Sequence, residues 1–295
     1  MIIIHSVEKL NGYLTEIRKE GKTVGFAPTM GALHQGHVSL ITAAKKQCDI
    51  VVCSIFVNPT QFNDLSDLEK YPRTIDADCV ILRSAGCDIL FAPEVSEIYT
   101  ARELELKQQH MEDKSWTMGK TVDFGLLDKV MEGAHRPGHF NGVAQVVSKL
   151  FRIVQPVKAF FGQKDFQQLS VIRSMVKQLD LPIEIIACPI VRETDGLAMS
   201  SRNRRLSAEE RDEVKLIYQT LSIVKENYQL STIADLKKLV EVAFKLSALI
   251  KLDYFEIVDS ETLQPIAAFD TGRSAVACIA VQLQTVRLID NVIMY

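Results

Sequence analysis

Strand-like and helix-like segments alternate along this chain as far as residue 187. Short apolar runs at residues 23–27, 50–56, 88–91, 158–162 and 183–187 have the length of buried strands. Segments with helical periodicity lie between them, at residues 38–46, 75–85, 143–154 and 169–179. This alternation predicts an α/β fold with a parallel sheet covered on both faces, with ligands at the carboxyl ends of its strands.

The pattern changes after Pro189. A polar segment to Arg205 precedes helical patterns at 208–226 and 233–249, which are followed by strand-like runs at 255–258, 275–283 and 287–290. A block of helices followed by strands is typical of an α+β unit. We therefore expect two domains, at residues 1–187 and 188–295.

Residues 28–37, PTMGALHQGH, join the first of these strands to the first helix. A helix start offers unpaired backbone N–H groups and the positive end of its dipole, which favour an anion such as phosphate. Gly31 and Gly36 allow close approach of the backbone, and His34 and His37 can both donate to phosphate oxygens. The segment predicts a nucleotide site. The alternative is that the two histidines merely cap the helix.

Residues 161–168, FGQKDFQQ, again lead from a strand into a helix. Lys164 can neutralise phosphate, Asp165 can accept from ribose hydroxyls, and the glutamines can bind a polar substrate. The alternative is an ordinary helix start, with Asp165 near the N-terminus of the helix.

Residues 191–203, VRETDGLAMSSRN, are polar and lie at the expected domain junction. Such a segment can close over a nucleotide and offer hydroxyls and a guanidinium to its terminal phosphates. The alternative is a plain linker, which would explain the polarity but not the run Met-Ser-Ser-Arg.

Two further segments carry weaker signals. Residues 55–62, IFVNPTQF, end a strand with amide side chains that can bind hydroxyl or carboxylate groups. Residues 133–142, GAHRPGHFNG, contain two histidines, but Pro137 prevents the helix that ligation at i and i+4 would use. We expect a substrate loop there and no protein-bound metal.

Composition restricts the partners. The formal net charge is −3 without a long block of like charges, which argues against nucleic acid, so a small-molecule substrate is expected. The six cysteines form neither a C-x-x-C pair nor zinc-finger spacing, and we expect buried free thiols in a reducing cytosol. The start of the chain does not resemble a signal peptide, and no apolar run is long enough to span a membrane, so a cytoplasmic location is expected.

Six motifs together resemble one known family. They are PTMGALHQGH, FVNPTQF, YPRT with Asp76 and Asp78, RPGHFNGV, FGQKDFQQL and VRETDGLAMSSRN, and they occur in this order over residues 22–206. The combination is similar to the pantoate–beta-alanine ligases of the nucleotidylyltransferase superfamily. The departures are Phe166, where the family commonly has tyrosine, and Gln163, where glutamate is common.

The resemblance implies a Rossmann-like N-terminal domain with a smaller α+β C-terminal lid domain, usually in a homodimer. It implies that ATP and (R)-pantoate form pantoyl adenylate and pyrophosphate, with Mg²⁺ on the phosphates. Beta-alanine then attacks the acyl carbon and releases pantothenate and AMP. Alignment and charge stabilisation suffice for adenylation, because the pantoate carboxylate is itself the nucleophile.

The resemblance also implies roles for individual residues. His34 and His37 would stabilise the transition state at the α-phosphate. The phosphates would be held by Lys164, Ser200, Ser201 and Arg202, the ribose by Gly162 and Asp165, and the adenine by the backbone of Val191. Gln61 and Gln168 would bind pantoate, with Gln61 also at the beta-alanine site. The remaining ATP contacts would be Met30, Gly31, Ala32, Leu33, Gln35, Gly36, Gln163 and Met199.

Two other functions remain open from the residues. A related nucleotidylyltransferase for another acid or phosphate would share the His-x-Gly-His segment but would not need both glutamines with FVNPTQF. A catalytically silent nucleotide-binding regulator is the second, and the intact Lys164, His34 and His37 argue against it.

Overall fold

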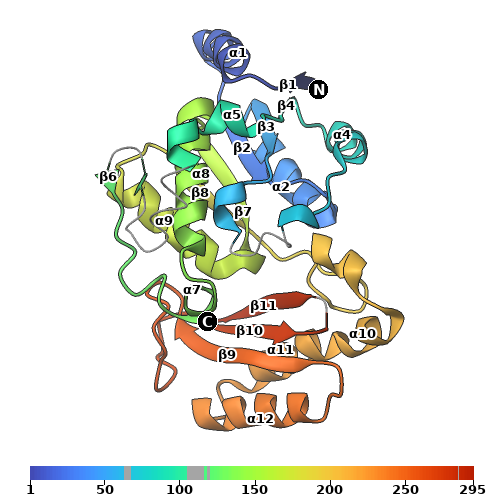
Figure 1. The fold of residues 1–295 in the computed structure, drawn as a ribbon. Helices are drawn as coiled ribbons and strands as arrows, with labels where there is room; N and C mark the ends of the chain where they lie inside the picture. Colours follow the sequence, from blue (N-terminus) through green and yellow to red (C-terminus); the bar gives the residue numbers. More distant parts are fainter. Residues whose placement is uncertain (63–67, 105–115, 118–119, 285) are drawn as a thin grey trace.

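Two separate sheets organise the chain in the computed structural model, which describes residues 1–62, 68–104, 116–117, 120–284 and 286–295 (Figure 1). The larger sheet has six parallel strands in the order β1-β4-β3-β2-β7-β8. Their bounds are β1 Ile2–Ile4, β2 Val24–Thr29, β3 Ile50–Ile55, β4 Ile89–Phe91, β7 Lys158–Gly162 and β8 Glu184–Cys188. The predicted parallel sheet is confirmed, and β1 is an additional edge strand.

Helices cover both faces of this sheet, as predicted. On one face lie α2 (Gln35–Lys45) and α4 (Ile75–Ser84), and on the other α1 (Val7–Lys19), α8 (His139–Val154) and α9 (Phe166–Gln178). Successive strand residues face opposite sides, so Phe26 and Val52 pack toward α8 while Ala27 and Val51 pack toward α2. The short helices are α5 (Val95–Ile98) and α7 (Met131–His135), and β5 (Trp116–Thr117) pairs antiparallel with β6 (Lys120–Thr121).

The second sheet is antiparallel, in the order β11-β10-β9, with β9 at Lys251–Asp259, β10 at Ala275–Gln282 and β11 at Arg287–Met294. Two helices, α11 (Lys215–Asn227) and α12 (Ile233–Lys245), share a hydrophobic core with it. The helix-then-strand order predicted for this part of the chain is confirmed.

Two of the predicted helices have different lengths. The single helix expected over 208–226 is divided into α10 (Ala208–Glu213) and α11, because the amide of Ile217 donates to the carbonyl of Val214 in a tighter turn. The helix expected to reach residue 249 ends at Lys245. There the hydroxyl of Ser247 accepts from the amides of Leu249 and Ile250, which gives these amides a non-helical partner.

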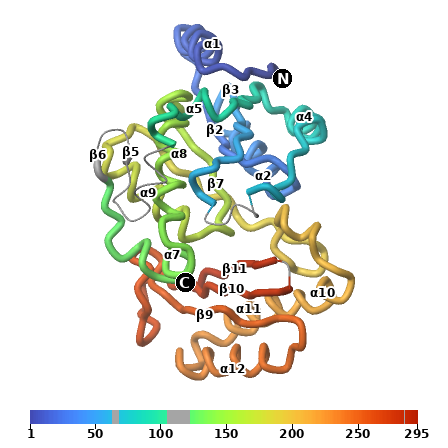
Figure 2. Tube along the Cα trace, viewed as in Figure 1, coloured from blue at the N-terminus to red at the C-terminus, as the bar shows by residue number. Residues whose placement is uncertain are grey.

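The two sheets meet through a small apolar cluster. Val276 and Cys278 of β10 pack with Met131 of α7 and Phe166 at the start of α9. The neighbouring β10 residues face the other way, toward α11 and α12. Figure 2 shows α7 lying between the two sheets. The start of α9 is thereby brought close to the second sheet.

The other expectations about the chain concern its thiols and its helices. All six cysteines are free and buried, as predicted. None of the described helices combines the length and the apolar character that a membrane span requires.

Candidate active site

The predicted segments meet at one edge of the parallel sheet. The strands β2, β3 and β7 end at Thr29, Ile55 and Gly162, and parallel neighbours have their carboxyl ends at a common edge. Leading from these ends are the His-x-Gly-His segment and two 3-10 turns, η1 (Pro59–Gln61) and η2 (Gln163–Asp165). The structure therefore brings together motifs that are far apart in the sequence.

His34 and His37 form a reciprocal cap at the start of α2. The Nδ1 atom of His34 accepts from the amide of Gly36 at 3.1 Å, and Nδ1 of His37 accepts from the amide of His34 at 3.3 Å. A neutral imidazole whose Nδ1 accepts must carry its proton on Nε2. The capping alternative is therefore correct as geometry, but it occupies only one nitrogen of each ring and leaves the Nε2–H donors.

The two rings are close to each other and uncharged. Their centroids are 4.1 Å apart. Burial, together with the positive charges of Lys164 and Arg204, lowers the pKa of His34 to about 4. Burial, the neighbouring His34 and Lys164 lower the pKa of His37 to about 3. At neutral pH the site therefore holds two neutral hydrogen-bond donors beside a lysine.

Gly36 is required by the position of the His34 ring. A Cβ atom at Gly36 would lie 2.8 Å from Cε1 and 2.9 Å from Nδ1 of His34. Any larger residue would push the ring away and break the cap, so the glycine of the His-x-Gly-His motif serves the geometry of the first histidine.

The backbone amides of this segment behave differently from the prediction. The Asp78 carboxylate accepts from the amides of Ala32 and Leu33, at 3.0 and 2.8 Å, and from the hydroxyl of Thr74. Further amides donate to Thr29, to the two imidazoles or to the carbonyl of His34, namely those of Gly31, His34, Gly36, His37 and Val38. Most of the amides expected to be free for phosphate are therefore already bonded. Among the described residues, the amides of Met30 and Gln35 have no such partner, so the expectation of unpaired N–H groups holds for these two alone.

Asp78 is a supporting residue whose role was not recognised from the sequence. It is 1% exposed and lies in the first turn of α4. It fixes the backbone just before His34, which leaves Ala32 and Leu33 without a free amide for a ligand. An acidic residue on the otherwise apolar buried face of α4, beside Cys79 and Leu82, was the available signal.

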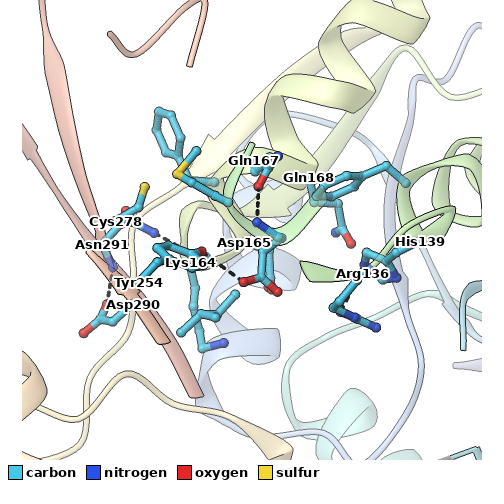
Figure 3. A pocket seen from close by; sticks show the side chains of 15 residues that line it. Arg136, His139, Lys164, Asp165, Gln167, Gln168, Tyr254, Cys278, Asp290 and Asn291 are labelled. Atoms are coloured by element: carbon cyan, nitrogen blue, oxygen red, sulfur yellow. Dashed lines mark hydrogen bonds between the residues drawn. The ribbon is translucent and has the colours of Figure 1, made fainter. Parts of the chain in front are cut away.

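One cavity lies between the two sheets (Figure 3). Among the residues that line it are Arg136, His139, Lys164, Asp165, Gln168, Asp290 and Asn291. The predicted residues Lys164, Asp165 and Gln168 therefore share one cavity, while Asp290 and Asn291 of β11 were not predicted. Within the described part of the chain, the ammonium group of Lys164 forms no ion pair.

Gln61 approaches the same edge from η1. The imidazole of His139 bonds through Nδ1 to the carbonyl of Gln61 at 2.9 Å, and the Asn58 amide donates to the carbonyl of Gly142 at 3.2 Å. The side-chain amide of Gln61 contacts the sulfur of Met30. These contacts connect the FVNPTQF and RPGHFNGV motifs to the His-x-Gly-His segment.

His139 is held as a neutral group in this arrangement. Burial, with the nearby charge of Arg136, lowers the pKa of His139 to about 3. Its Nε2 atom lies 3.3 Å from Nη1 of Arg136. Among the described residues, no group of three or more His, Cys, Asp or Glu side chains is arranged to hold a metal ion.

Residues 191–203, called the serine-arginine segment from here on, also reach the His-x-Gly-His segment. Met199 donates from its amide to the carbonyl of Val191 at 3.0 Å, and a Cβ atom at Gly36 would lie 3.8 Å from Cβ of Met199. Ser200 caps the 3-10 turn η3 (Ser201–Arg205) by accepting from the Arg202 amide at 3.2 Å. The guanidinium of Arg204 donates to the carbonyl of Leu33 at 3.4 Å.

Ion pairs attach this segment to the second sheet and its helices. Arg192 binds both carboxylate oxygens of the buried Asp290, at 2.6 and 3.0 Å. Arg211 of α10 pairs with Glu193 and with Asp195, the latter at 2.8 Å. Residues 191–203 are therefore anchored to the second sheet and to α10, and they do not form an unattached linker.

A glycine is required where this segment turns. Gly196 has a φ of +92°, and a Cβ atom there would lie 2.2 Å from Cδ1 of Tyr218. The guanidinium of Arg192 stacks on the same Tyr218 ring at 3.9 Å and donates to the carbonyl of Gly196 at 3.0 Å. The sequence Thr-Asp-Gly thus forms a turn that fits against α11.

The fold and the site define an α/β protein with neutral and cationic hydrogen-bond donors at the carboxyl edge of its parallel sheet. This edge faces the second sheet. Comparisons with known proteins give the family. The profile described as pantoate-beta-alanine ligase matches residues 2–293. A pantothenate synthetase of Bacteroides thetaiotaomicron is 49% identical over 292 residues, which cover 99% of this chain and 98% of that protein.

Solved structures agree with this match. The crystal structure of pantothenate synthetase from Thermus thermophilus has a TM-score of 0.87 at 40% identity and covers 99% of both chains. Pantoate-beta-alanine ligase from Francisella tularensis, complexed with beta-gamma ATP and beta-alanine, has a TM-score of 0.73 at 31% identity, covering 99% of this chain and 97% of that one. The chain belongs to the pantoate–beta-alanine ligase family.

Proposed function

We propose that this chain condenses (R)-pantoate with beta-alanine at the expense of ATP, through a pantoyl adenylate, to give pantothenate, AMP and pyrophosphate. The observation that carries this proposal is the pair of neutral imidazoles beside Lys164, at the edge where the glutamine-bearing segments also converge. The family and the ATP and beta-alanine named for the Francisella tularensis relative support it.

In the first step, the pantoate carboxylate attacks the α-phosphate of ATP and pyrophosphate leaves. The Nε2–H groups of His34 and His37 donate to the α-phosphate oxygens as negative charge develops there. Lys164 holds the phosphates together with Ser200, Ser201 and Arg202, and the two cationic side chains neutralise charge there. Because the imidazoles are neutral, they stabilise charge without transferring a proton.

Pantoate is oriented by neutral amides. Gln61 and Gln168 donate to its oxygen atoms without pairing the carboxylate to a fixed cation, so the carboxylate stays nucleophilic. In the second step, the amine of beta-alanine attacks the acyl carbon and AMP leaves, with Gln61 also contacting beta-alanine. Water must be excluded meanwhile, because the adenylate is an activated ester.

ATP binding involves the rest of the predicted contact set. The ribose lies against Gly162 and Asp165, and the adenine contacts the backbone of Val191. The other contacts are Met30, Gly31, Ala32, Leu33, Gln35, Gly36, Gln163 and Met199. Ala32 and Leu33 contribute through the position of their backbone, since their amides are bonded to Asp78.

Mg²⁺ fits this site as an ion carried by the nucleotide. ATP phosphates and water supply most of the octahedral ligands of Mg²⁺, so a protein cage is not needed. The exposed Asp165 beside Lys164 offers one carboxylate at the cavity. When bound, the ion neutralises charge on the phosphates.

We also infer that the chain acts as a cytoplasmic homodimer, with domains dividing near residue 188 and the second domain closing as a lid. The six free thiols fit a reducing compartment. The separate cores of the two sheets support the division. The ion pairs of Arg192 and Arg211 would make residues 191–203 move together with the second sheet.

The test is a coupled assay for AMP. We expect AMP only when ATP, Mg²⁺, pantoate and beta-alanine are all present, with pantothenate identified by mass spectrometry. Turnover with another acid in place of pantoate would indicate a different nucleotidylyltransferase. ATP binding without any turnover would indicate a silent nucleotide-binding protein. Either result would contradict the proposal.

A further inference from the structure

Asn291 extends from the second sheet to the turn that carries Lys164. It lies in β11 and is 2% exposed. Its side-chain nitrogen donates to the carbonyl of Gln163 at 3.0 Å and to that of Lys164 at 2.9 Å. Both hydrogens of one amide group are therefore used on consecutive carbonyls of η2.

Asn291 is itself fixed on its other side. Its backbone amide donates to Oδ1 of Asp290 at 2.8 Å, and its carbonyl accepts from Nη2 of Arg192 at 3.3 Å. Arg192 in turn holds Asp290 through two bonds. The serine-arginine segment (residues 191–203), β11 and η2 are thus joined by a continuous set of hydrogen bonds that are buried or partly buried.

The side chain of Lys164 has no comparable support. Among the described residues it forms neither a hydrogen bond nor an ion pair through its ammonium group, which is carried on a flexible four-carbon chain. Its direction therefore depends on where its backbone is held. Its charge already acts on both imidazoles, since it contributes to the lowered pKa of His34 and of His37.

We propose that Asn291 is a positioning residue for Lys164, which holds the η2 backbone so that the ammonium group faces His34 and His37. The side-chain nitrogen of Asn291 donates to the η2 backbone, so the role assigned to it is to position Lys164 and not to contact the reacting atoms. The inference rests on the proposed function in that Lys164 binds the phosphates of ATP. Asn291, a residue of the second sheet, would thus support a phosphate-binding residue at the edge of the first sheet.

The experiment is a double-mutant cycle. Asn291→Ala and Asn291→Leu each remove the two donors, and the leucine keeps the size of the side chain. Single-turnover adenylate formation should fall about 10- to 100-fold in both, as expected when a reacting group is misplaced by roughly 1 Å. Asn291→Ala should have no further effect in a Lys164→Ala background, because a residue that acts through Lys164 has nothing left to position.

Gln282→Ala is the matched control. Gln282 lies in the same sheet and also donates from its side-chain amide to backbone carbonyls, those of Leu283 and Val286, and among the described residues it has no hydrogen bond to η2. It should leave adenylation unchanged. The melting temperature of every variant is also measured. A variant that melts like the wild type but forms adenylate slowly has lost positioning and not structure, and Asn291→Leu is the better suited to this comparison because it keeps the size of the side chain.

Two results would overturn the inference. One is a wild-type rate in both Asn291 variants, and the other is full additivity with Lys164→Ala. Failure of the proposed function is visible separately, because the wild type would then make no adenylate. In that case calorimetric titration with a non-hydrolysable ATP analogue replaces the rate: equal, non-additive weakening in the Asn291 and Lys164 variants supports the inference, and unchanged affinity in the Asn291 variants refutes it.

Discussion

The two sides of the candidate site are built from different chemistry. On the side of the parallel sheet, His34, His37 and His139 are neutral and are held by hydrogen bonds to the backbone. On the side of the second sheet, residues 191–203 are held mainly by ion pairs, from Arg192 to Asp290 and from Arg211 to two carboxylates. One side depends on burial, and the other depends on charge.

This difference has consequences for solvent and salt. Neutral buried hydrogen bonds are indifferent to ionic strength, whereas half-exposed ion pairs are screened. The Arg211 and Glu193 side chains are each 30% exposed, while that of Asp290 is 2% exposed. High salt should therefore weaken the partly exposed ion pair between Arg211 and Glu193. It should leave the hydrogen bonds of His34 and His37 unchanged.

The largest effect on activity is expected from a substitution of His37 that keeps the function of one ring nitrogen and removes that of the other. His37→Asn keeps an acceptor near the position of Nδ1, and hence the cap, but removes the Nε2–H donor. Single-turnover adenylate formation should fall by about 100-fold or more, as when a transition-state donor is lost. His37→Gln, which places an amide near Nε2, should retain more activity. Near-normal adenylation by the asparagine variant would eliminate the proposed role.

The next effect concerns the neutral glutamines. Gln61→Ala and Gln168→Ala should each weaken pantoate binding by about 1–3 kcal/mol, because a polar group of the substrate loses its partner. ATP binding measured without pantoate should change little. Gln178→Ala, at the far end of α9 from the site, is the control. Calorimetry that finds equal losses of ATP and pantoate affinity would assign the glutamines to the fold or the nucleotide site.

A smaller effect follows from protonation of the buried imidazoles. In the unfolded chain, a histidine titrates near its ordinary pKa of about 6.5, whereas in the folded chain burial lowers the pKa of His37 to about 3. Stability is thus fully present above about pH 6.5 and is lost as the pH falls toward 3, because the unfolded state binds the proton first.

The measurement is the free energy of unfolding of wild type and His37→Asn at two pH values. On going from pH 7.5 to pH 5.5, the wild type should lose about 1 kcal/mol more than the variant, which lacks the titrating group. Equal losses would mean that His37 is protonated with equal ease in the folded and unfolded chains. The claim that the fold holds His37 neutral would then be wrong.

The smallest effect belongs to the charged side. Arg211→Ala should lower the free energy of unfolding by no more than about 1 kcal/mol, since its partners are partly exposed. The difference from wild type should disappear in about 1 M NaCl, where the Debye length is near 3 Å. A loss that persists at high salt would show that Arg211 acts through packing, and the distinction between the two sides would weaken.

Much of the fold could be predicted because its information is local. Apolar runs and helical spacing identified the five main strands and their crossovers, and parallel strands need crossovers. The helix α1 was missed although Leu10, Leu14 and Ile17 have helical spacing and Ser6 is its N-cap. The order of strands in the sheet, with β1 beside β4, depends on contacts distant in sequence and was not predicted.

The site was predictable to the extent that its residues lie in continuous motifs. His34, Lys164 and Gln168 follow strand ends directly, so the sheet explains their convergence. Asp290 and Asn291 come from the last strand of the second sheet, and nothing local to that strand indicates a contact with η2. The amides of Ala32 and Leu33 were expected to be free and are not, for the same reason, because Asp78 reaches them from another helix.

The account rests most directly on the claim that His34 and His37 are neutral at pH 7 with the proton on Nε2. Proton–nitrogen correlation spectra of protein labelled with ¹⁵N histidine, with His34→Asn and His37→Asn for assignment, report both the charge and the tautomer. We expect the Nε2–H pattern for both rings, unchanged from pH 8 down to about pH 5. An imidazolium at pH 7, or a proton on Nδ1 of either ring, would contradict the account.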